Sequence, residues 1–114
     1  MRLNAEPFEM IESGRKTVEL RLYDEKRKRI SVGDEILFVS ASDGAKKLLC
    51  EVVLLHIFPS FADLYSALPL LKCGYTEETL AAASPSDMRK YYSEEQERET
   101  GVIGIEIKLK NKEE

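Results

Sequence analysis

Apolar and polar residues alternate strictly along residues 17–23, so that three apolar side chains fall on one face and charged side chains on the other. A period of two is typical of a β-strand with one face against the core. The pattern therefore predicts a half-buried strand with Glu19 and Arg21 on its polar face. The side chains expected in the core are Val18, Leu20 and Leu22.

A second pair of strand patterns surrounds the Asp43-Gly44 dipeptide. The segment after the Gly33-Asp34 turn carries Ile36 and Phe38 in step, and a long apolar run returns over residues 45–58. An Asp-Gly pair between two such runs is typical of a hairpin turn. The sequence therefore predicts that these two segments pair antiparallel.

The period changes to that of a helix after Pro59, with Ser60 as the candidate N-cap of a helix over residues 60–71. Capping residues predict further short helices, and the capping-box spacing of Ser93 and Gln96 predicts a break after the last of them. These further helices are expected over residues 7–14, 76–84 and 84–92, and terminal strands over 1–4 and 101–109.

Strands at both ends, a central hairpin and helices before the last strand predict an α+β fold, a small β-barrel of about five or six strands with short helices packed around it. A length of 114 residues leaves room for one domain of ordinary size. We expect a single domain over residues 1–110 and a frayed C-terminal tail over 111–114.

Charge limits the partners that the chain can attract. The formal net charge is −4, so any anionic partner must be drawn to a local patch and not to the average field. Basic residues crowd into residues 13–30. The longest apolar run is too short to span a bilayer and is interrupted by Glu51 and His56, and no signal peptide is apparent, so we expect a cytoplasmic protein without a membrane partner.

The sequence predicts neither a metal site nor a cofactor. Cys50 and Cys73 lie outside any CxxC motif and are expected to be reduced thiols, and His56 is the only histidine. No GxGxxG motif, P-loop or Ser-His-Asp order is present.

Four residues, Gly14, Lys16, Glu19 and Arg21, match the pattern GxKxxExR, between a predicted helix and a predicted strand. Together with the downstream Gly-Asp turn and the helices before the last strand, they make nearly the whole chain resemble the ASCH domain family of the PUA-like superfamily. The resemblance implies a β-barrel with a cleft beside the motif, and binding of RNA or of a modified nucleoside.

The residues themselves agree with such a site. An arginine offers a planar fork and a lysine a point charge to phosphate, and Glu19 can accept a hydrogen bond from a base amine or a sugar hydroxyl. The alternative to a binding site is a purely structural role, a surface ion pair of Glu19 with Arg21. Further candidate RNA-binding or ligand-binding residues are Arg15, Tyr92 and Ser93, and the loop residues Lys26, Arg27, Lys28 and Arg29. The alternatives for these are rim packing for Tyr92, an N-cap for Ser93 and a solvated hairpin tip for the loop.

Three functions remain open from the sequence. The first is RNA or nucleotide binding. The second is hydrolysis of RNA or of a modified nucleoside, with Lys16 and Glu19 as the catalytic pair. Related acetylcytidine amidohydrolases carry a threonine three residues after the motif lysine, where this chain has Glu19, which departs from that mechanism. The third is a protein-interaction module that uses the acidic segment 91–99.

Overall fold

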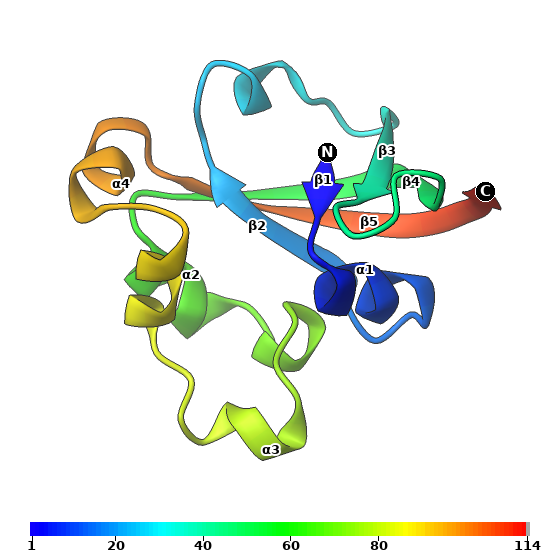
Figure 1. Ribbon diagram of the computed structural model, residues 1–114. Helices are drawn as coiled ribbons and strands as arrows, with labels where there is room; N and C mark the ends of the chain where they lie inside the picture. The colour runs from blue at the N-terminus through cyan, green and yellow to red at the C-terminus, as the bar shows by residue number, and fades with distance from the viewer. Residues whose placement is uncertain (114) are drawn as a thin grey trace.

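Five strands form one sheet in the order β1-β3-β4-β5-β2 (Figure 1). The computed structural model describes residues 1–113 of the chain. Only β1 runs parallel to its neighbour, and the other pairs are antiparallel. The strands are β1 (Arg2–Leu3), β2 (Val18–Leu22), β3 (Glu35–Ser40), β4 (Lys47–Phe58) and β5 (Val102–Glu113).

The two long strands β4 and β5 pair along their full length and shift register at Leu49/Cys50 and at Val52/Leu54. Such irregularities bend a strand and increase its twist, so the sheet curls into a half-barrel. The predicted α+β fold with a curled, barrel-like sheet is confirmed. The predicted hairpin is confirmed as well, because β3 and β4 pair antiparallel around the Asp43-Gly44 turn, with Val39 opposite Lys47.

Short helices connect the strands, and most lie between β4 and β5. The predicted helix over 60–71 is shorter than expected, because Leu68 and Pro69 are extended. The segment expected as a helix over 84–92 is a 3₁₀ helix, and it ends before Ser93 starts a new helix, as predicted. The helices are α1 (Ala5–Glu12), η1 (Arg27–Arg29), α2 (Phe61–Ala67), η2 (Leu70–Lys72), α3 (Glu77–Leu80), η3 (Pro85–Lys90) and α4 (Glu94–Thr100).

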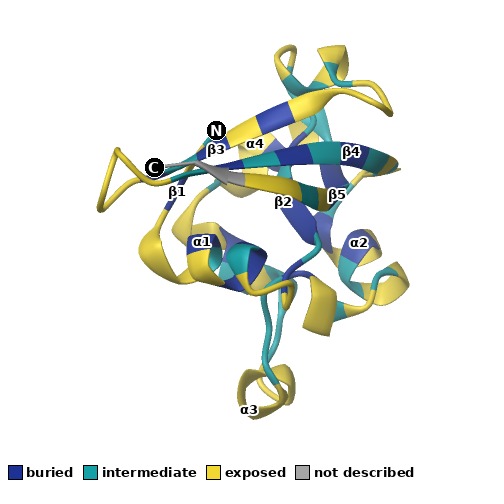
Figure 2. Cartoon of the chain, turned by 90° about the vertical axis from the view of Figure 1, so that its right-hand side faces the viewer, coloured by how far each residue is buried: buried dark blue, intermediate teal, exposed yellow. Residues whose placement is uncertain are grey.

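The core consists of two clusters. Helix α1 packs Phe8 and Ile11 against β3, β4 and β5, and α2 packs Phe61 and Leu64 against β2 and the start of β5. Buried positions follow the strands and the inner sides of α1 and α2, whereas α3 is exposed (Figure 2). The predicted core residues of β2 are confirmed, since Val18, Leu20 and Leu22 are all buried.

Two expectations were wrong. Strand β2 is not half-buried: only 4% of Glu19 is exposed, because other segments of the chain cover its polar face too. The tail expected over 111–114 continues β5 as far as Glu113, because backbone pairing with β4 does not need apolar side chains, and Glu114 lies outside the described residues.

Candidate functional site

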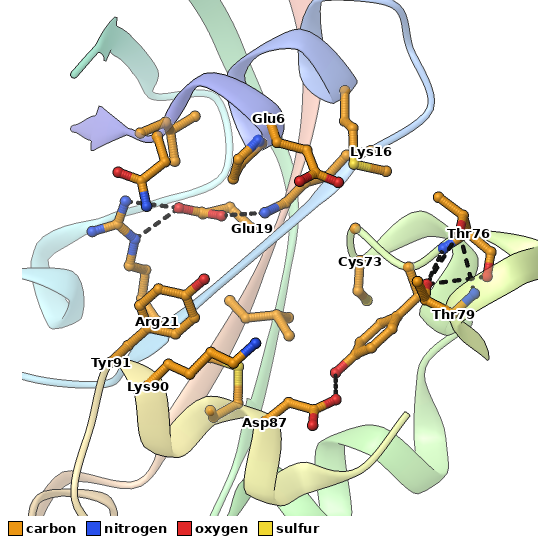
Figure 3. Close-up of a pocket in the computed structure, with 18 of the residues that line it drawn as sticks. Glu6, Lys16, Glu19, Arg21, Cys73, Thr76, Thr79, Asp87, Lys90 and Tyr91 are labelled. Carbon is orange, nitrogen blue, oxygen red and sulfur yellow. Dashed lines mark hydrogen bonds and ion pairs between the residues drawn. The ribbon is translucent and has the colours of Figure 1, made fainter. Parts of the chain in front are cut away.

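A cleft of about 970 Å³ opens beside β2. Residues near the start of the chain and on β2 form one side, and residues of α3 and η3 form the other (Figure 3). Lys16, Glu19 and Arg21 all line it. This volume lies within the range of small-ligand sites, about 300–1,000 Å³.

Glu19 pairs with two cations, one on each carboxylate oxygen. Lys16 Nζ lies 2.8 Å from Glu19 Oε1, and Arg21 Nη2 lies 2.7 Å from Glu19 Oε2. Arg21 also donates from Nε to Glu19 Oε2 at 2.8 Å and from Nη2 to the backbone carbonyl of Arg2 at 3.1 Å. Two cations and one anion thus form a connected network that keeps one surplus positive charge.

The turn before β2 sets the position of Lys16. Gly14 adopts a φ of 81° after the end of α1, and the Lys16 amide donates to the carbonyl of Met10 at 3.0 Å. Gly74 covers the other side, where an added Cβ would lie 3.5 Å from Lys16 Cδ, and its φ of 110° favours glycine. Contacts on both sides therefore hold the Lys16 ammonium group beside Glu19.

Glu19 is ionised despite its burial. Burial by itself would raise the pKa of this carboxyl group, but the charges and hydrogen bonds of Lys16 and Arg21 lower the pKa below the usual value of 4.5. A general base must accept a proton, and a carboxylate stabilised in its charged form by two cations is a weak proton acceptor. The geometry therefore disfavours the general-base role that the hydrolytic alternative gives to Glu19.

This depressed pKa has a consequence for stability. Because the unfolded state binds a proton more readily than the folded state, Glu19 stabilises the fold above its unfolded pKa near 4.5, and that contribution is lost as the pH falls towards the folded pKa. We expect the difference in free energy of unfolding between wild type and Glu19→Gln to shrink steadily below about pH 4.5. Urea unfolding from pH 7 to pH 3 measures it, and a constant difference over that range would contradict the assignment.

Across the cleft, Tyr75 connects two other side chains. Its hydroxyl donates to Asp87 Oδ2 at 2.7 Å and lies 2.7 Å from the hydroxyl of Tyr65. Asp87 Oδ2 also accepts from the Ser84 amide at 3.2 Å. The hydrogen bond from Tyr75 lowers the pKa of Asp87, and burial raises the pKa of Tyr75. This wall therefore presents an ionised carboxylate and neutral phenols at pH 7.

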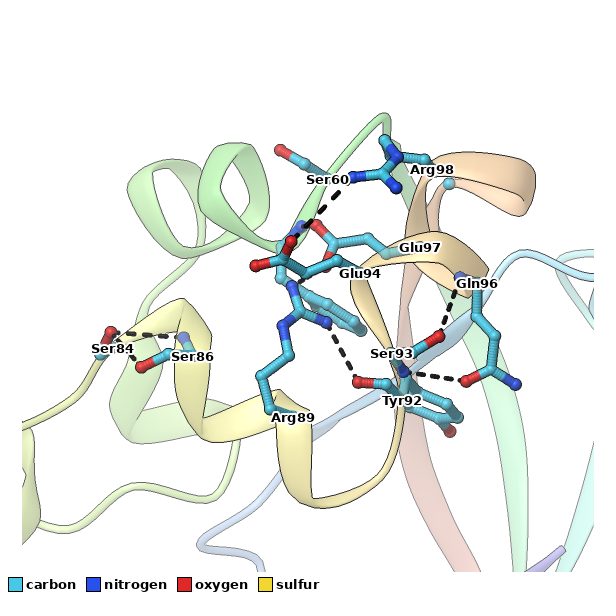
Figure 4. A network of polar contacts seen from close by, with 12 residues as sticks. Ser60, Ser84, Ser86, Arg89, Tyr92, Ser93, Glu94, Gln96, Glu97 and Arg98 are labelled. Atoms are coloured by element: carbon cyan, nitrogen blue, oxygen red, sulfur yellow. Dashed lines mark hydrogen bonds and ion pairs between the residues drawn. The ribbon is translucent and has the colours of Figure 1, made fainter.

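Two consecutive tyrosines after η3 also line the cleft. The Tyr92 ring stacks on Phe61 with 6.1 Å between ring centroids, whereas Tyr91 is 58% exposed. Arg89 donates to the carbonyl of Tyr92 at 3.1 Å and forms an ion pair with the buried Glu97 on α4 (Figure 4). The Tyr92 backbone is thus fixed, while the Tyr91 ring is open to a ligand.

The profile of the ASCH domain family matches residues 1–111. The chain belongs to the ASCH domain family. ASCH domains are commonly thought to bind RNA. No curated protein sequence is similar enough to this ASCH domain to match it.

Two solved structures resemble this ASCH domain over nearly their whole length. The crystal structure of the hypothetical protein PH0355 is 29% identical, covers 96% of both chains and superposes with a TM-score of 0.76. The solution NMR structure of the protein PF0455 from Pyrococcus furiosus is 28% identical, covers 96% of this chain and 97% of its own, and has a TM-score of 0.61.

The ASCH domain brings together four of the candidate residues from the sequence, namely Lys16, Glu19, Arg21 and Tyr92. Arg15 is exposed and is not part of the cleft lining; it lines a neighbouring hollow, which shares half of its lining residues with the cleft, and it donates from Nε to Ser13 Oγ at 3.0 Å. Ser93 also lies outside the cleft and caps α4 by accepting from the Gln96 amide at 3.1 Å.

The basic loop also lies outside the cleft lining. Within it, Arg27 pairs with Asp24 at 3.1 Å, and Lys28 lies 3.4 Å from Glu25 and 5.7 Å from the centre of the Tyr23 ring. Arg27 and Lys28 therefore have partners inside the loop itself. Lys26 and Arg29 are exposed, and phosphate contacts by the loop stay a prediction.

Sequence reasoning missed Arg2, Tyr75, Asp87 and Lys90 as cleft residues. The one local signal for the segment that contains Tyr75 and Lys90 is a pair of capping boxes, at Thr76 and Ser84, which fix the starts of α3 and η3. Hydrophobic periodicity gives no information about the cleft residues between 75 and 90, because this segment contains only the short helices α3 and η3.

Other reactive groups give no site of their own. Cys73 lines the cleft, but burial raises the pKa of its thiol to about 11, so it is not a thiolate at neutral pH. His56 lies 3.2 Å from Glu106. Residues 1–111 contain no group of three or more potential metal ligands, and no helix among them is long and apolar enough to cross a membrane.

Proposed function

We propose that this protein binds RNA or a nucleotide in the cleft beside Lys16, Glu19 and Arg21. One observation carries the proposal: a buried carboxylate fixes two cations at the floor of a cleft large enough for a nucleotide. Membership in a family commonly thought to bind RNA supports it.

Lys16, Glu19 and Arg21 have different roles in the proposed site. Both oxygens of Glu19 are engaged by cations, so Glu19 acts by positioning Lys16 and Arg21 and not by accepting from a base. The cations contact phosphate, since charge-assisted hydrogen bonds to phosphate are among the strongest in proteins. The exposed Tyr91 ring offers a face on which an unpaired base can stack.

Replacement of Arg21 tests this function. Arg21→Gln removes the charge and the fork of the guanidinium group, and we expect RNA affinity to fall about ten- to a hundredfold at low salt, the value of one charge-assisted hydrogen bond. Fluorescence anisotropy with a short labelled single-stranded RNA and with its duplex measures the loss.

The matched control is Arg98→Gln, which removes an equal charge from an exposed arginine on α4 that does not line the cleft. We expect it to change RNA affinity less than twofold, by about the loss of one exposed, screened charge. Equal losses in the two variants would mean that RNA binds by net charge alone, and the cleft would not be the site. Absence of binding to either RNA would favour a protein-interaction module.

A further inference from the structure

The cleft contains as many acids as bases, so the position of each charge matters more than the total. The bases are Arg2, Lys16, Arg21 and Lys90, and the acids are Glu6, Glu19, Glu78 and Asp87. Glu78 lies on the exposed α3, and Asp87 is bonded to Tyr75 and Ser84. These two acids therefore belong to the side of the cleft formed by α3 and η3, whereas Glu6, in the first turn of α1, lies on the other side with Arg2 and Arg21.

Arg21 has N–H donors that the Glu19 network does not use. Its Nε and Nη2 atoms donate to Glu19 and the Arg2 carbonyl, whereas Nη1 makes no hydrogen bond to any atom of residues 1–111. A guanidinium nitrogen carries two N–H donors, and Arg21 lines the cleft. A ligand oxygen can therefore bind at Nη1 without disturbing the Glu19 network.

The backbone of Arg2 contacts Arg21, because the Arg2 carbonyl accepts from Arg21 Nη2 at 3.1 Å, and Arg2 lines the same cleft. Lys90 lines the same cleft from the η3 side, and Figure 3 shows it opposite Glu19. Neither Arg2 nor Lys90 forms an ion pair with a residue that the structure describes, and both are exposed. Both charges are therefore available to an anion.

We propose that Arg2, Arg21 and Lys90 form a phosphate-binding subsite, so that the cleft prefers a nucleoside monophosphate unit over an unphosphorylated nucleoside. This inference rests on the proposed nucleotide-binding function and adds which part of the ligand is selected. The monophosphate unit has two sources, a free mononucleotide or one nucleotide of an RNA chain. The surplus charge of the Glu19 network and the two unpaired cations give three positive charges, enough to neutralise the two negative charges of a phosphate dianion.

Paired titrations test the preference. Isothermal titration at low salt with adenosine, guanosine, cytidine and uridine, and with the 5′- and 3′-monophosphate of each, gives the affinity ratio of nucleotide to nucleoside. For the base that binds most tightly, we expect either the 5′- or the 3′-monophosphate to bind at least about tenfold more tightly than the nucleoside. A short RNA that binds more tightly than that monophosphate identifies RNA as the source, and equal affinities identify the free nucleotide.

Arg2→Gln and Lys90→Gln locate the subsite. Each removes an exposed, unpaired cation, so we expect the fold to be kept. The affinity ratio of nucleotide to nucleoside should fall at least about threefold, while nucleoside affinity stays within twofold of wild type. Lys26→Gln removes a similar charge outside the cleft and should leave the ratio unchanged.

The outcomes separate the two proposals. Suppose that wild type binds nucleotide and nucleoside equally well, while Arg21→Gln still loses RNA binding. This result overturns the phosphate subsite and leaves the proposed function standing. A tenfold ratio that neither Arg2→Gln nor Lys90→Gln reduces also overturns the subsite. Absence of binding to RNA, nucleosides and nucleotides alike overturns both.

Discussion

Glu19→Gln should lower the free energy of unfolding by about 3 kcal/mol, the usual cost of removing one partner from a buried ion pair. The neutral amide keeps the shape of the side chain but leaves Lys16, which is 8% exposed, beside an uncharged group. Arg21 loses its main partner at the same time. Urea unfolding at pH 7, followed by far-UV circular dichroism, measures the change.

Two further proteins make this result interpretable. Glu25→Gln removes the same charge from an exposed pair with Lys28, and its stability should equal that of wild type within experimental error. Lys16→Met in the Glu19→Gln background removes the stranded cation, so we expect it to recover part of the loss. A loss below about 1 kcal/mol in Glu19→Gln would show that the network behaves as a surface pair, the interpretation that the sequence left open.

Local signals predicted those parts of the fold whose cause is local. The Asp43-Gly44 turn and the period of β2 depend on a few neighbouring residues, and both were predicted correctly. A strand pattern shows which side chains share a face, but it does not show what covers the second face. For that reason the burial of Glu19 was missed, although its face was assigned correctly.

The candidate site was predictable only as far as the motif extends. Lys16, Glu19 and Arg21 are close in sequence, so their grouping follows from a turn and one strand. Arg2 and Lys90 reach the same cleft from segments far apart in the chain, through pairing of β1 with β3 and through the packing of η3. Such contacts depend on the tertiary structure, and a single sequence does not contain a local signal for them.

Glu97→Ala should lower the free energy of unfolding by about 3 kcal/mol through a different mechanism. Glu97 Oε2 accepts from the buried amide of Phe61 at 2.9 Å, and Oε1 pairs with Arg89 (Figure 4). Alanine leaves that amide without an acceptor, which costs about 1–3 kcal/mol, and removes the partner of a partly buried guanidinium group. Chemical unfolding at pH 7 measures the loss.

Matched variants on the same helix identify the cause. Glu97→Gln keeps an oxygen for the Phe61 amide and loses the charge, so we expect a smaller loss of about 1 kcal/mol, and Glu99→Ala at an exposed position should lie close to wild type. Equal losses in Glu97→Gln and Glu97→Ala would assign the effect to the ion pair alone. Because Arg2, Arg21 and Lys90 are untouched, folded Glu97→Ala protein should keep its preference for nucleotide over nucleoside, which separates support of the cleft from contact with the ligand.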